Sequence, residues 1–236
     1  MSPTKPRAPR ELGTVVVTGG SSGLGAAVVD AVAAAGGSPA VLDRRPPRDG
    51  VPYVEVDLAD SRAAGDAVAR LVEAAGPPSA VVTAAGIDVP GELGEVDPQV
   101  WERVVRVNLF GTVAVVRACL PYLEECYGTV VTVASTLALR GMSGATAYSA
   151  SKFAVRGFTQ ALAAELAGRV AVTGLVPGGM RTAFFDDRDE RYRPGPDAQL
   201  NDPADTAAAV LTALRQPVGS EIREMLVMAS RESSWP

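Results

Sequence analysis

The stretch T-V-V-V-T-G-G-S-S-G-L-G, residues Thr14–Gly25, decides the fold. Its first five residues predict a buried strand, and the glycines that follow stand where a helix is expected to begin. Glycine permits a tight turn and a close approach of the backbone to phosphate, and a helix N-terminus favours that anion. Asp43 ends the next expected strand, eighteen residues after Gly25. These features together predict a dinucleotide-binding unit.

Strands and helices alternate along the rest of the chain. Such alternation predicts right-handed βαβ crossovers, and therefore a doubly wound α/β fold of the Rossmann type with a mostly parallel, seven-stranded sheet. One domain over residues 13–236 is expected, preceded by a disordered tail at residues 1–12. The expected strands are 14–18, 40–43, 53–56, 80–84, 129–134, 170–176 and 225–228, and the expected helices 23–35, 61–75, 98–125, 147–167 and 203–215.

Composition excludes several classes of function. A net charge of −5 over 236 residues, without a cluster of Lys or Arg, argues against a nucleic-acid surface. The chain has no His and two Cys, so no metal site is expected, and Cys119 and Cys126 are interpreted as buried free thiols. No stretch is interpreted as a signal peptide or as long and apolar enough to span a bilayer. A cytoplasmic protein that binds no membrane is therefore expected.

A tyrosine and a lysine are the most informative pair outside the glycine run. Tyr148 and Lys152, in Y-S-A-S-K, share one face if the segment is helical. A cation beside a phenol favours the ionised form, so we expect the pKa of Tyr148 to lie below its ordinary value of about 10. Because the chain contains no histidine, which usually transfers protons at neutral pH, this phenol is the natural candidate for an acid–base group.

Over residues 13–230 the chain resembles the short-chain dehydrogenase/reductase family. The family's T-G-x-x-x-G-x-G stands at residues 18–25, its acidic residue near the adenine is Asp57, and its helix asparagine is Asn108. Its strand-end serine is Ser135, thirteen residues before the tyrosine, and its P-G-x-x-x-T stands at residues 177–182. One motif departs: the usual N-N-A-G is T-A-A-G at residues 83–86, where Thr83 could supply a hydroxyl in place of the asparagine.

The resemblance implies a catalytic set of Asn108, Ser135, Tyr148 and Lys152. Tyr148 would take the proton of a substrate alcohol while hydride leaves for a nicotinamide, and Lys152 would favour the tyrosinate and bind the nicotinamide ribose. Ser135 would hydrogen-bond the substrate oxygen. Asn108 would hold a water that links the lysine to solvent. The expected enzyme is an NAD(P)-dependent oxidoreductase that interconverts a secondary alcohol and a ketone.

NAD is the expected cofactor, with NADP possible. A carboxylate at Asp43 accepts hydrogen bonds from the ribose hydroxyls and repels a 2′-phosphate, whereas Arg44 and Arg45 could accommodate that phosphate. Met180 and Thr182 would hold the carboxamide end. The full expected cofactor set is Gly19, Ser21, Ser22, Gly23, Leu24, Gly25, Asp43, Arg44, Asp57, Leu58, Ala84, Ala85, Gly86, Tyr148, Lys152, Pro177, Gly178, Met180 and Thr182.

The substrate end is less defined. The long, charged connection at residues 183–201 predicts a mobile flap over the site. The expected pocket residues suggest an apolar alcohol or ketone, while Arg140 and Arg181 could meet an anion.

Alternatives are an NADPH-dependent biosynthetic ketoreductase and a non-catalytic nucleotide-binding regulator. The resemblance also implies a homodimer or homotetramer. The expected pocket residues are Ser135, Thr136, Leu137, Met142, Phe184 and Phe185.

Overall fold

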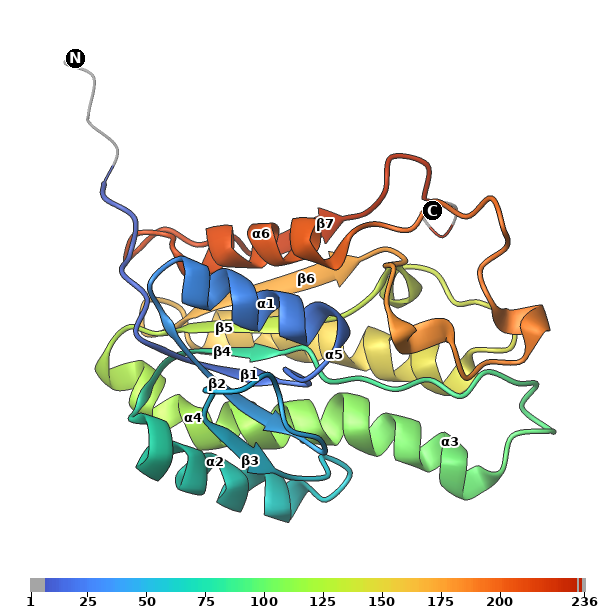
Figure 1. Cartoon of the computed structure of the whole chain (residues 1–236), viewed down its shortest axis with the longest axis horizontal. Helices are drawn as coiled ribbons and strands as arrows, with labels where there is room; N and C mark the ends of the chain where they lie inside the picture. Colours follow the sequence, from blue (N-terminus) through green and yellow to red (C-terminus); the bar gives the residue numbers. More distant parts are fainter. Residues whose placement is uncertain (1–6, 233, 235–236) are drawn as a thin grey trace.

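Seven parallel strands form the central sheet, in the order β3-β2-β1-β4-β5-β6-β7. The computed structural model, in which residues 7–232 and 234 are described, confirms the predicted Rossmann-type architecture (Figure 1). The order reverses at β1, so the connections from β1 and from β4 leave in opposite directions and open a crevice at the carboxyl ends of these strands. The strands are β1 (Thr14–Thr18), β2 (Ser38–Asp43), β3 (Tyr53–Glu55), β4 (Pro78–Thr83), β5 (Thr129–Val133), β6 (Ala171–Pro177) and β7 (Glu224–Val227).

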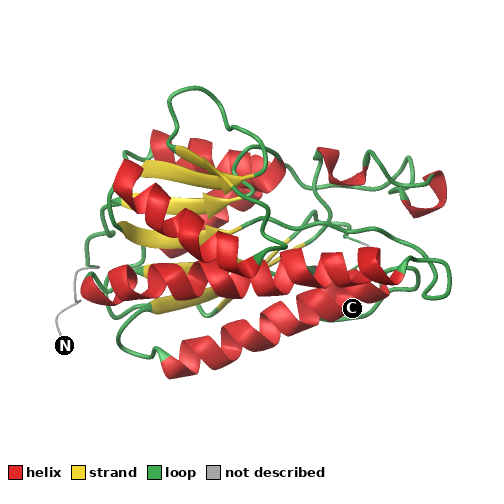
Figure 2. Cartoon of the chain, turned by 90° about the horizontal axis from the view of Figure 1, so that it is seen from below, coloured by secondary structure: helices red, strands yellow, loops and turns green. Residues whose placement is uncertain are grey.

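Helices cover both faces of the sheet (Figure 2). Successive side chains of a strand point to opposite faces, and β1 shows the consequence. Val15 and Val17 pack with α1 and α6, whereas Val16 between them packs with α2, α4 and α5. Continuous runs of valine in the strands therefore reflect burial on both sides. The helices are α1 (Gly23–Ala34), α2 (Ser61–Ala75), α3 (Pro98–Val105), α4 (Thr112–Glu125), α5 (Thr146–Glu165) and α6 (Pro203–Leu214).

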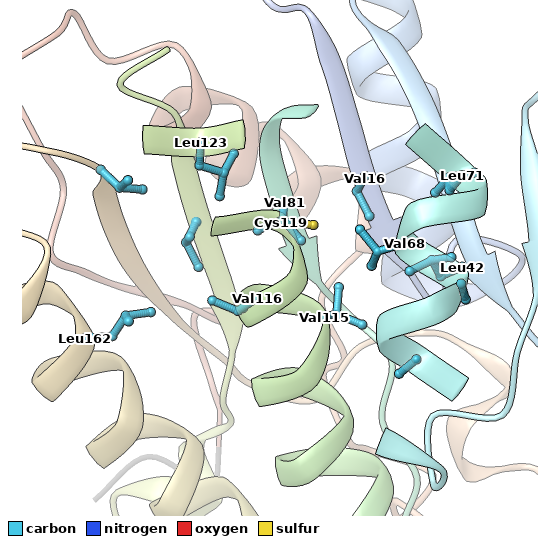
Figure 3. Close-up of a cluster of buried hydrophobic side chains, with 14 of the residues drawn as sticks. Val16, Leu42, Val68, Leu71, Val81, Val115, Val116, Cys119, Leu123 and Leu162 are labelled. Carbon is cyan, nitrogen blue, oxygen red and sulfur yellow. The ribbon is translucent and has the colours of Figure 1, made fainter. Parts of the chain in front are cut away.

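The larger core cluster lies between the sheet and helices α2, α4 and α5 (Figure 3). Leu71 of α2, Val115 of α4 and Val81 of β4 are at most 1% exposed. Burying a side chain of this size contributes about 1.5–3 kcal/mol. Cys119 is buried in the same cluster, as expected, but Cys126 is exposed, because it lies just past the end of α4. The expectation of two buried thiols is therefore half wrong.

The predicted helix over residues 98–125 is interrupted in the structure. Arg106–Gly111 forms a π-helical stretch between α3 and α4, with Asn108 inside it. A π-helical turn inserts an extra residue into the α-helical pattern and often marks a functional position. Gly111 fits this stretch because a Cβ there would meet Leu58 at 2.8 Å, closer than real contacts allow.

The same run corrects the expectation that no stretch could span a bilayer. By length and composition alone, Pro98–Glu125, with 28 residues, could cross a membrane. In the fold, 44% of its most apolar window is buried inside the protein, where Val115, Val116 and Cys119 belong to the core. That packing accounts for part of its apolar character.

The N-terminal segment is described from residue 7. Arg10 N donates to Arg215 O at 3.0 Å, and the Arg10 side chain donates to Thr129 Oγ1 at 3.1 Å. Arg7 donates to Val218 O at 2.7 Å. The expected disordered tail covers residues 1–12, of which residues 1–6 lie outside the described residues. Residues 7–12 run along the end of the sheet opposite the crevice.

Candidate active site

A cavity of about 1330 Å³ lies at the carboxyl ends of β1, β4, β5 and β6. The reversal of strand order places it there, since loops on either side of β1 diverge and leave space above the strand ends. Its walls come from the glycine loop, the ends of β2 and β4, the start of α5 and residues 183–200. The flap predicted at residues 183–201 forms the outer wall, at the right of Figure 1.

The glycine loop is shaped for close approach. Gly19 has φ +69°, and a Cβ there would lie 2.8 Å from Ala85 Cα, so glycine is required on both counts. A Cβ at Gly25 would collide with the Gly19 carbonyl. Backbone N–H groups at the start of α1 consequently lie open to the cavity, where a phosphate could accept hydrogen bonds from them.

Capping residues support the same interpretation. The N-termini of α2, α3 and α6 are capped by Asp60, Asp97 and Asp202, whose side chains accept hydrogen bonds from first-turn N–H groups. Ser22 occupies the N-cap position of α1, but its side chain accepts no capping hydrogen bond among the described residues. A helix end without a cap needs another partner for its N–H groups, and a dinucleotide pyrophosphate provides acceptors of the right charge. The loop residues fit that group.

Asp43 ends β2 at the edge of the cavity. Its Oδ2 accepts from Ser21 N at 3.0 Å, and its Oδ1 accepts from Arg44 N at 2.6 Å and Arg45 N at 3.3 Å. These bonds fix the carboxylate beside the glycine loop, at the position predicted for ribose recognition. Ser21 differs from prediction, because it does not line the cavity and instead braces the loop against Asp43 and Arg45 O.

Asp57, predicted to lie near the adenine, lines the cavity. Its Oδ1 accepts from Ala59 N at 3.0 Å, and its Oδ2 pairs with Arg103 of α3 at 2.6 Å. Burial raises the pKa of the Asp57 carboxyl, but the hydrogen bonds from Arg103 and Ala59 outweigh this and leave the pKa below its ordinary value. Arg103 also lines the cavity and was not predicted from the sequence.

Ser135, Tyr148 and Lys152 converge at the inner end of the cavity. Ser135 follows β5, and the other two lie on α5, one turn apart. Lys152 Nζ lies 5.5 Å from the centroid of the Tyr148 ring and donates to Val133 O at 2.9 Å. The helical i,i+4 geometry predicted for the pair is thus present, and β5 fixes the position of the ammonium.

The expectation that the pKa of Tyr148 lies below its ordinary value is wrong for this site as described. Burial raises the pKa of Tyr148 to about 12, and a hydrogen bond with Ser135 offsets this only in part. Burial also lowers the pKa of Lys152 to about 8, against the charge of Asp88, which raises it. Desolvation penalises both charged forms. At neutral pH the Tyr148 phenol is therefore neutral, and the Lys152 ammonium is closer to losing its proton than an ordinary lysine.

Asn108 connects the π-helical stretch to the loop after β4. Its Oδ1 accepts from Ile87 N at 2.8 Å, and its Nδ2 donates to Ile87 O at 2.9 Å and to Ser151 Oγ at 3.0 Å. The side chain is 1% exposed and does not line the cavity. Within this geometry its amide positions the strand-end loop, and the water relay predicted for it stays a prediction.

Thr83 does not replace the asparagine contact of the family motif. Its hydroxyl is buried and has no hydrogen-bond partner within residues 7–232 and 234. Thr18 Oγ1 accepts from Ala85 N at 3.0 Å, so β1 holds the strand-end loop without it. The substitution removes a polar link, and Thr18 and Asn108 secure the loop from either side.

The substrate end contains more charge than the sequence suggested. An ion pair between Asp88, two residues after Gly86, and Arg188 of the flap lines the cavity, with nitrogen and oxygen 3.0 Å apart. Nothing in the sequence pairs residues one hundred positions apart, so both were missed. Arg181, considered for anion binding, instead pairs with Asp202 at 3.1 Å. Arg140 and Arg181 do not line the cavity, whereas Thr136, Leu137, Met142, Phe184 and Phe185 do.

The C-terminal segment also reaches the site and was missed. Glu232 Oε2 accepts from Gly179 N at 2.8 Å, and Ser234 Oγ lies 2.6 Å from Thr136 Oγ1. Both residues line the cavity. A glycine after β6 is needed there, since a Cβ at Gly178 would meet Met228 at 2.7 Å. No local pattern predicts these contacts, because their partners lie 53 and 98 positions apart in the sequence.

The structure therefore brings the predicted residues together, and their individual roles stay predictions. Of the predicted cofactor and substrate residues, every one except Ser21 lines this cavity: Gly19, Ser22, Gly23, Leu24, Gly25, Asp43, Arg44, Asp57, Leu58, Ala84, Ala85, Gly86, Ser135, Thr136, Leu137, Met142, Tyr148, Lys152, Pro177, Gly178, Met180, Thr182, Phe184 and Phe185.

Fold and cavity define an oxidoreductase built around a nicotinamide-dinucleotide site. Comparison with known proteins gives the same class: the family model for short chain dehydrogenases matches residues 13–193. An uncharacterized oxidoreductase of Staphylococcus saprophyticus is 32% identical over 227 residues, covering 90% of this chain and 95% of the relative. The chain belongs to the short-chain dehydrogenase family, whose members act on CH–OH groups with NAD(P).

Relatives of other lengths and solved structures extend the comparison. The glycine betaine reductase of Emericella nidulans is 32% identical over 241 residues, yet this chain spans 19% of its length. An alcohol dehydrogenase of Thermococcus sibiricus complexed with 5-hydroxy-NADP has a TM-score of 0.82 at 23% identity, over 93% of this chain and 97% of that one. A 3-ketoacyl-(acyl-carrier-protein) reductase of Brucella melitensis complexed with NADH has a TM-score of 0.81 at 25% identity, over 92% and 96%.

Proposed function

We propose that the protein is an NAD-dependent dehydrogenase that interconverts a secondary alcohol and a ketone, with Tyr148 as the acid–base group. One observation carries the proposal. Ser135, Tyr148 and Lys152 line the same cavity as the N-terminus of α1, whose N-cap residue Ser22 makes no side-chain cap hydrogen bond within the described chain. A dinucleotide whose pyrophosphate lies at that N-terminus could extend its nicotinamide toward the phenol.

The roles follow from where each group lies. In the oxidation direction, Tyr148 Oη accepts the proton of the substrate hydroxyl, and Ser135 Oγ orients the substrate oxygen. A nicotinamide held in the cavity would supply the acceptor for the hydride that leaves the substrate carbon. Lys152, held by Val133 O, places a cation beside the phenol and favours its ionised form. Burial opposes that ionisation, so the phenol depends on nearby positive charge to act as a base.

Preference for NAD rests on Asp43. Three backbone N–H groups fix its carboxylate at the cavity edge, and Glu55 of β3 also lines that edge. A 2′-phosphate would meet this negative charge, whereas free ribose hydroxyls can donate to it. The solved relatives carry an NADP analogue in one case and NADH in the other. We therefore base the choice on this carboxylate.

A specific observation also favours a second candidate, an NADPH-dependent ketoreductase. Arg44 and Arg45 line the cavity immediately after Asp43. Guanidinium groups there could pair with a 2′-phosphate if Asp43 turned away. Relative binding of the two cofactors separates the candidates, since tighter binding of NADP than of NAD contradicts our use of Asp43.

We propose an uncharged secondary alcohol with an apolar substituent as the substrate. Leu137, Met142, Phe184 and Phe185 supply the apolar walls. The test is a screen of secondary alcohols with NAD that follows the absorbance of reduced nicotinamide, with the Tyr148→Phe variant as control. Turnover in the wild type that disappears in the variant supports the proposal. Turnover that survives in the variant contradicts it.

We also propose that the chain assembles as a homodimer or homotetramer. Phe110 and Phe153, on the π-helical stretch and on α5, are 52% and 45% exposed. Large exposed aromatic side chains on neighbouring elements are typical of a surface that is covered by a partner. Light scattering after size-exclusion chromatography tests this, and a monomeric mass would contradict it.

A further inference from the structure

A buried ion pair lies at the substrate end of the cavity, and the proposed function assigns it no role. Asp88 and Arg188 are 4% and 13% exposed at their side chains, and their closest charged atoms are 3.0 Å apart. Asp88 belongs to the loop after β4, which Asn108 holds through Ile87, whereas Arg188 belongs to the flap. The pair therefore joins a fixed loop to the outer wall of the cavity.

Arg188 also organises the aromatic side chains of the flap. Its guanidinium carbon lies 4.8 Å from the ring centroid of Phe184 and 4.6 Å from that of Phe185. The two rings meet edge to face, with centroids 5.5 Å apart. Phe184 in turn lies 5.8 Å from the Tyr148 ring. A continuous chain of contacts thus runs from Asp88 through Arg188 and Phe184 to the candidate catalytic phenol.

The geometry of the pair suits it to position the flap rather than to bind a ligand directly. Asp88 Oδ1 and Arg188 Nε are buried and have no hydrogen-bond partner among residues 7–232 and 234. A planar guanidinium can hold a carboxylate and stack on rings at the same time, which an ammonium cannot do. Breaking such a pair leaves a buried charge without a partner, which strongly favours any rearrangement that exposes it to water.

A second ion pair joins the same two segments and provides a matched control. Arg191 of the flap pairs with Glu95 at 3.3 Å, and both side chains are more than half exposed, at 57% and 55%. Exposed pairs contribute little because water screens them. If any ion pair were enough to hold the flap, loss of either pair would loosen it. If burial and the aromatic contacts are required, only loss of the Asp88–Arg188 pair would loosen it.

We propose that Asp88 and Arg188 are positioning residues whose buried ion pair holds residues 183–200 closed and keeps Phe184 against Tyr148, so that the pair sets affinity for substrate and leaves affinity for cofactor unchanged. The part that concerns substrate rests on the proposed function. The part that concerns the flap does not.

The first measurement is hydrogen exchange of the flap in the full chain, without substrate. We expect Asp88→Asn and Arg188→Gln to speed exchange of peptides from residues 183–200 by about tenfold or more, and Glu95→Gln by less than about twofold. Trypsin provides a second readout for Asp88→Asn and Glu95→Gln, because Arg188 and Arg191 offer cleavage sites in the flap, whereas Arg193 precedes Pro194 and resists cleavage. Equal exchange in Asp88→Asn and Glu95→Gln would overturn the proposal.

The second measurement separates positioning from general damage to the fold. For an alcohol found in the screen, we expect KM to rise about tenfold in Asp88→Asn, kcat to change less than about threefold, and the Kd of NAD to change less than about twofold. A loss of kcat at unchanged KM would contradict positioning. If no alcohol is turned over, the proposed function fails, and the exchange comparison still decides whether the pair holds the flap.

Conservative variants keep the test decisive. Arg188→Lys retains the charge but lacks the planar group, so we expect exchange between that of the wild type and that of Arg188→Gln. If Asp88→Asn does not fold, Arg188→Met is measured in its place, since an apolar side chain can pack between the rings without leaving a buried cation. Exchange in Arg188→Met at the wild-type rate would refute a role for the ion pair.

Discussion

Lys152 Nζ lies 5.5 Å from the centroid of the Tyr148 ring and donates a hydrogen bond to Val133 O at 2.9 Å. The lysine is therefore positioned by β5 and acts on the phenol through space. Burial raises the pKa of the phenol to about 12 and lowers that of the ammonium to about 8, so each group resists its charged form. The proton chemistry of the pair depends on how far bound cofactor adds positive charge and hydrogen bonds.

Replacing the phenol tests its role most directly. We expect Tyr148→Phe to lower kcat/KM by about 10²–10⁴-fold, the usual contribution of a positioned acid–base group. The Kd of NAD should stay within about twofold, because the ring is retained and the glycine loop is untouched. Steady-state kinetics and a fluorescence titration of the cofactor measure the two effects. A weakened Kd with unchanged kcat would assign Tyr148 to cofactor binding instead.

The ionisation of Tyr148 can be observed without substrate. We expect the absorbance difference at about 295 nm between wild type and Tyr148→Phe to show no tyrosinate from this residue below a pH of about 10.5 in the absence of cofactor. Burial is the cause, since it raises this pKa to about 12. Adding NAD should move the transition to lower pH, because the oxidised nicotinamide is positively charged. A transition below a pH of about 9 in the free protein would refute the desolvation argument.

Lys152 gives a stability prediction with a defined sign. Its pKa is lowered from 10.5 to about 8, so between these values the unfolded chain binds more protons than the folded one. The free energy of unfolding contributed by this group should therefore rise as pH increases from about 8 to 10.5, by up to roughly 3 kcal/mol. Urea unfolding of wild type and Lys152→Met across this range measures it. Parallel pH profiles for the two proteins would contradict the shift.

A direct titration is practical as a control, because Lys5 and Lys152 are the only lysines in the sequence. Isotopic methylation of the two lysine amines and the α-amino group should give three NMR signals. Lys5 should titrate near the ordinary lysine value of about 10.4, whereas both Lys152 and the α-amino group should titrate near pH 8. The Lys152→Met variant identifies the Lys152 signal by its absence.

Cofactor preference is predicted to depend on Asp43. We expect Asp43→Ala to reduce the NAD over NADP preference by about tenfold or more, since it removes the charge that a 2′-phosphate would face. Loss of the bonds to Ser21 N and Arg44 N should also loosen the glycine loop and weaken both cofactors somewhat. Kd values for both cofactors measure the ratio. An unchanged ratio would move the choice to Arg44 and Arg45.

Two N-cap residues, Asp97 and Ser22, are predicted to contribute differently to the free energy of unfolding. Asp97→Ala should lower the free energy of unfolding by about 0.5–2 kcal/mol, because its side chain accepts from Gln99 N and Val100 N. Ser22→Ala should cost less, since Ser22 makes no side-chain cap bond within the described chain. Denaturant unfolding compares the two. An equal loss would mean that Ser22 caps α1 in solution, so that its N-terminus is not reserved for a ligand.

Much of the fold could be predicted because its signals are local. The glycine loop, the valine runs of β1 and β5, and the spacing of Tyr148 and Lys152 all arise within a few residues, where backbone geometry dictates the outcome. The π-helical turn around Asn108 could not be predicted, because no local residue pattern marks it, and its Gly111 lies close to Leu58, which is distant in the sequence. The spanning potential of residues 98–125 was misjudged for a similar reason, since an apolar core helix and a membrane helix share a composition.

By itself the sequence determined the sheet, the phosphate loop and the group of residues that meet at the strand ends, because parallel strands place all their carboxyl ends on one side. Tertiary structure alone decided the charge environment. Burial reversed the expected shift of the Tyr148 pKa. The Thr83 hydroxyl is left without a hydrogen-bond partner in the described chain. The fold also places Arg188 beside Asp88, one hundred residues away in the sequence. Desolvation and long-range pairing depend on which groups surround an atom in space, so the local sequence pattern does not predict either of them.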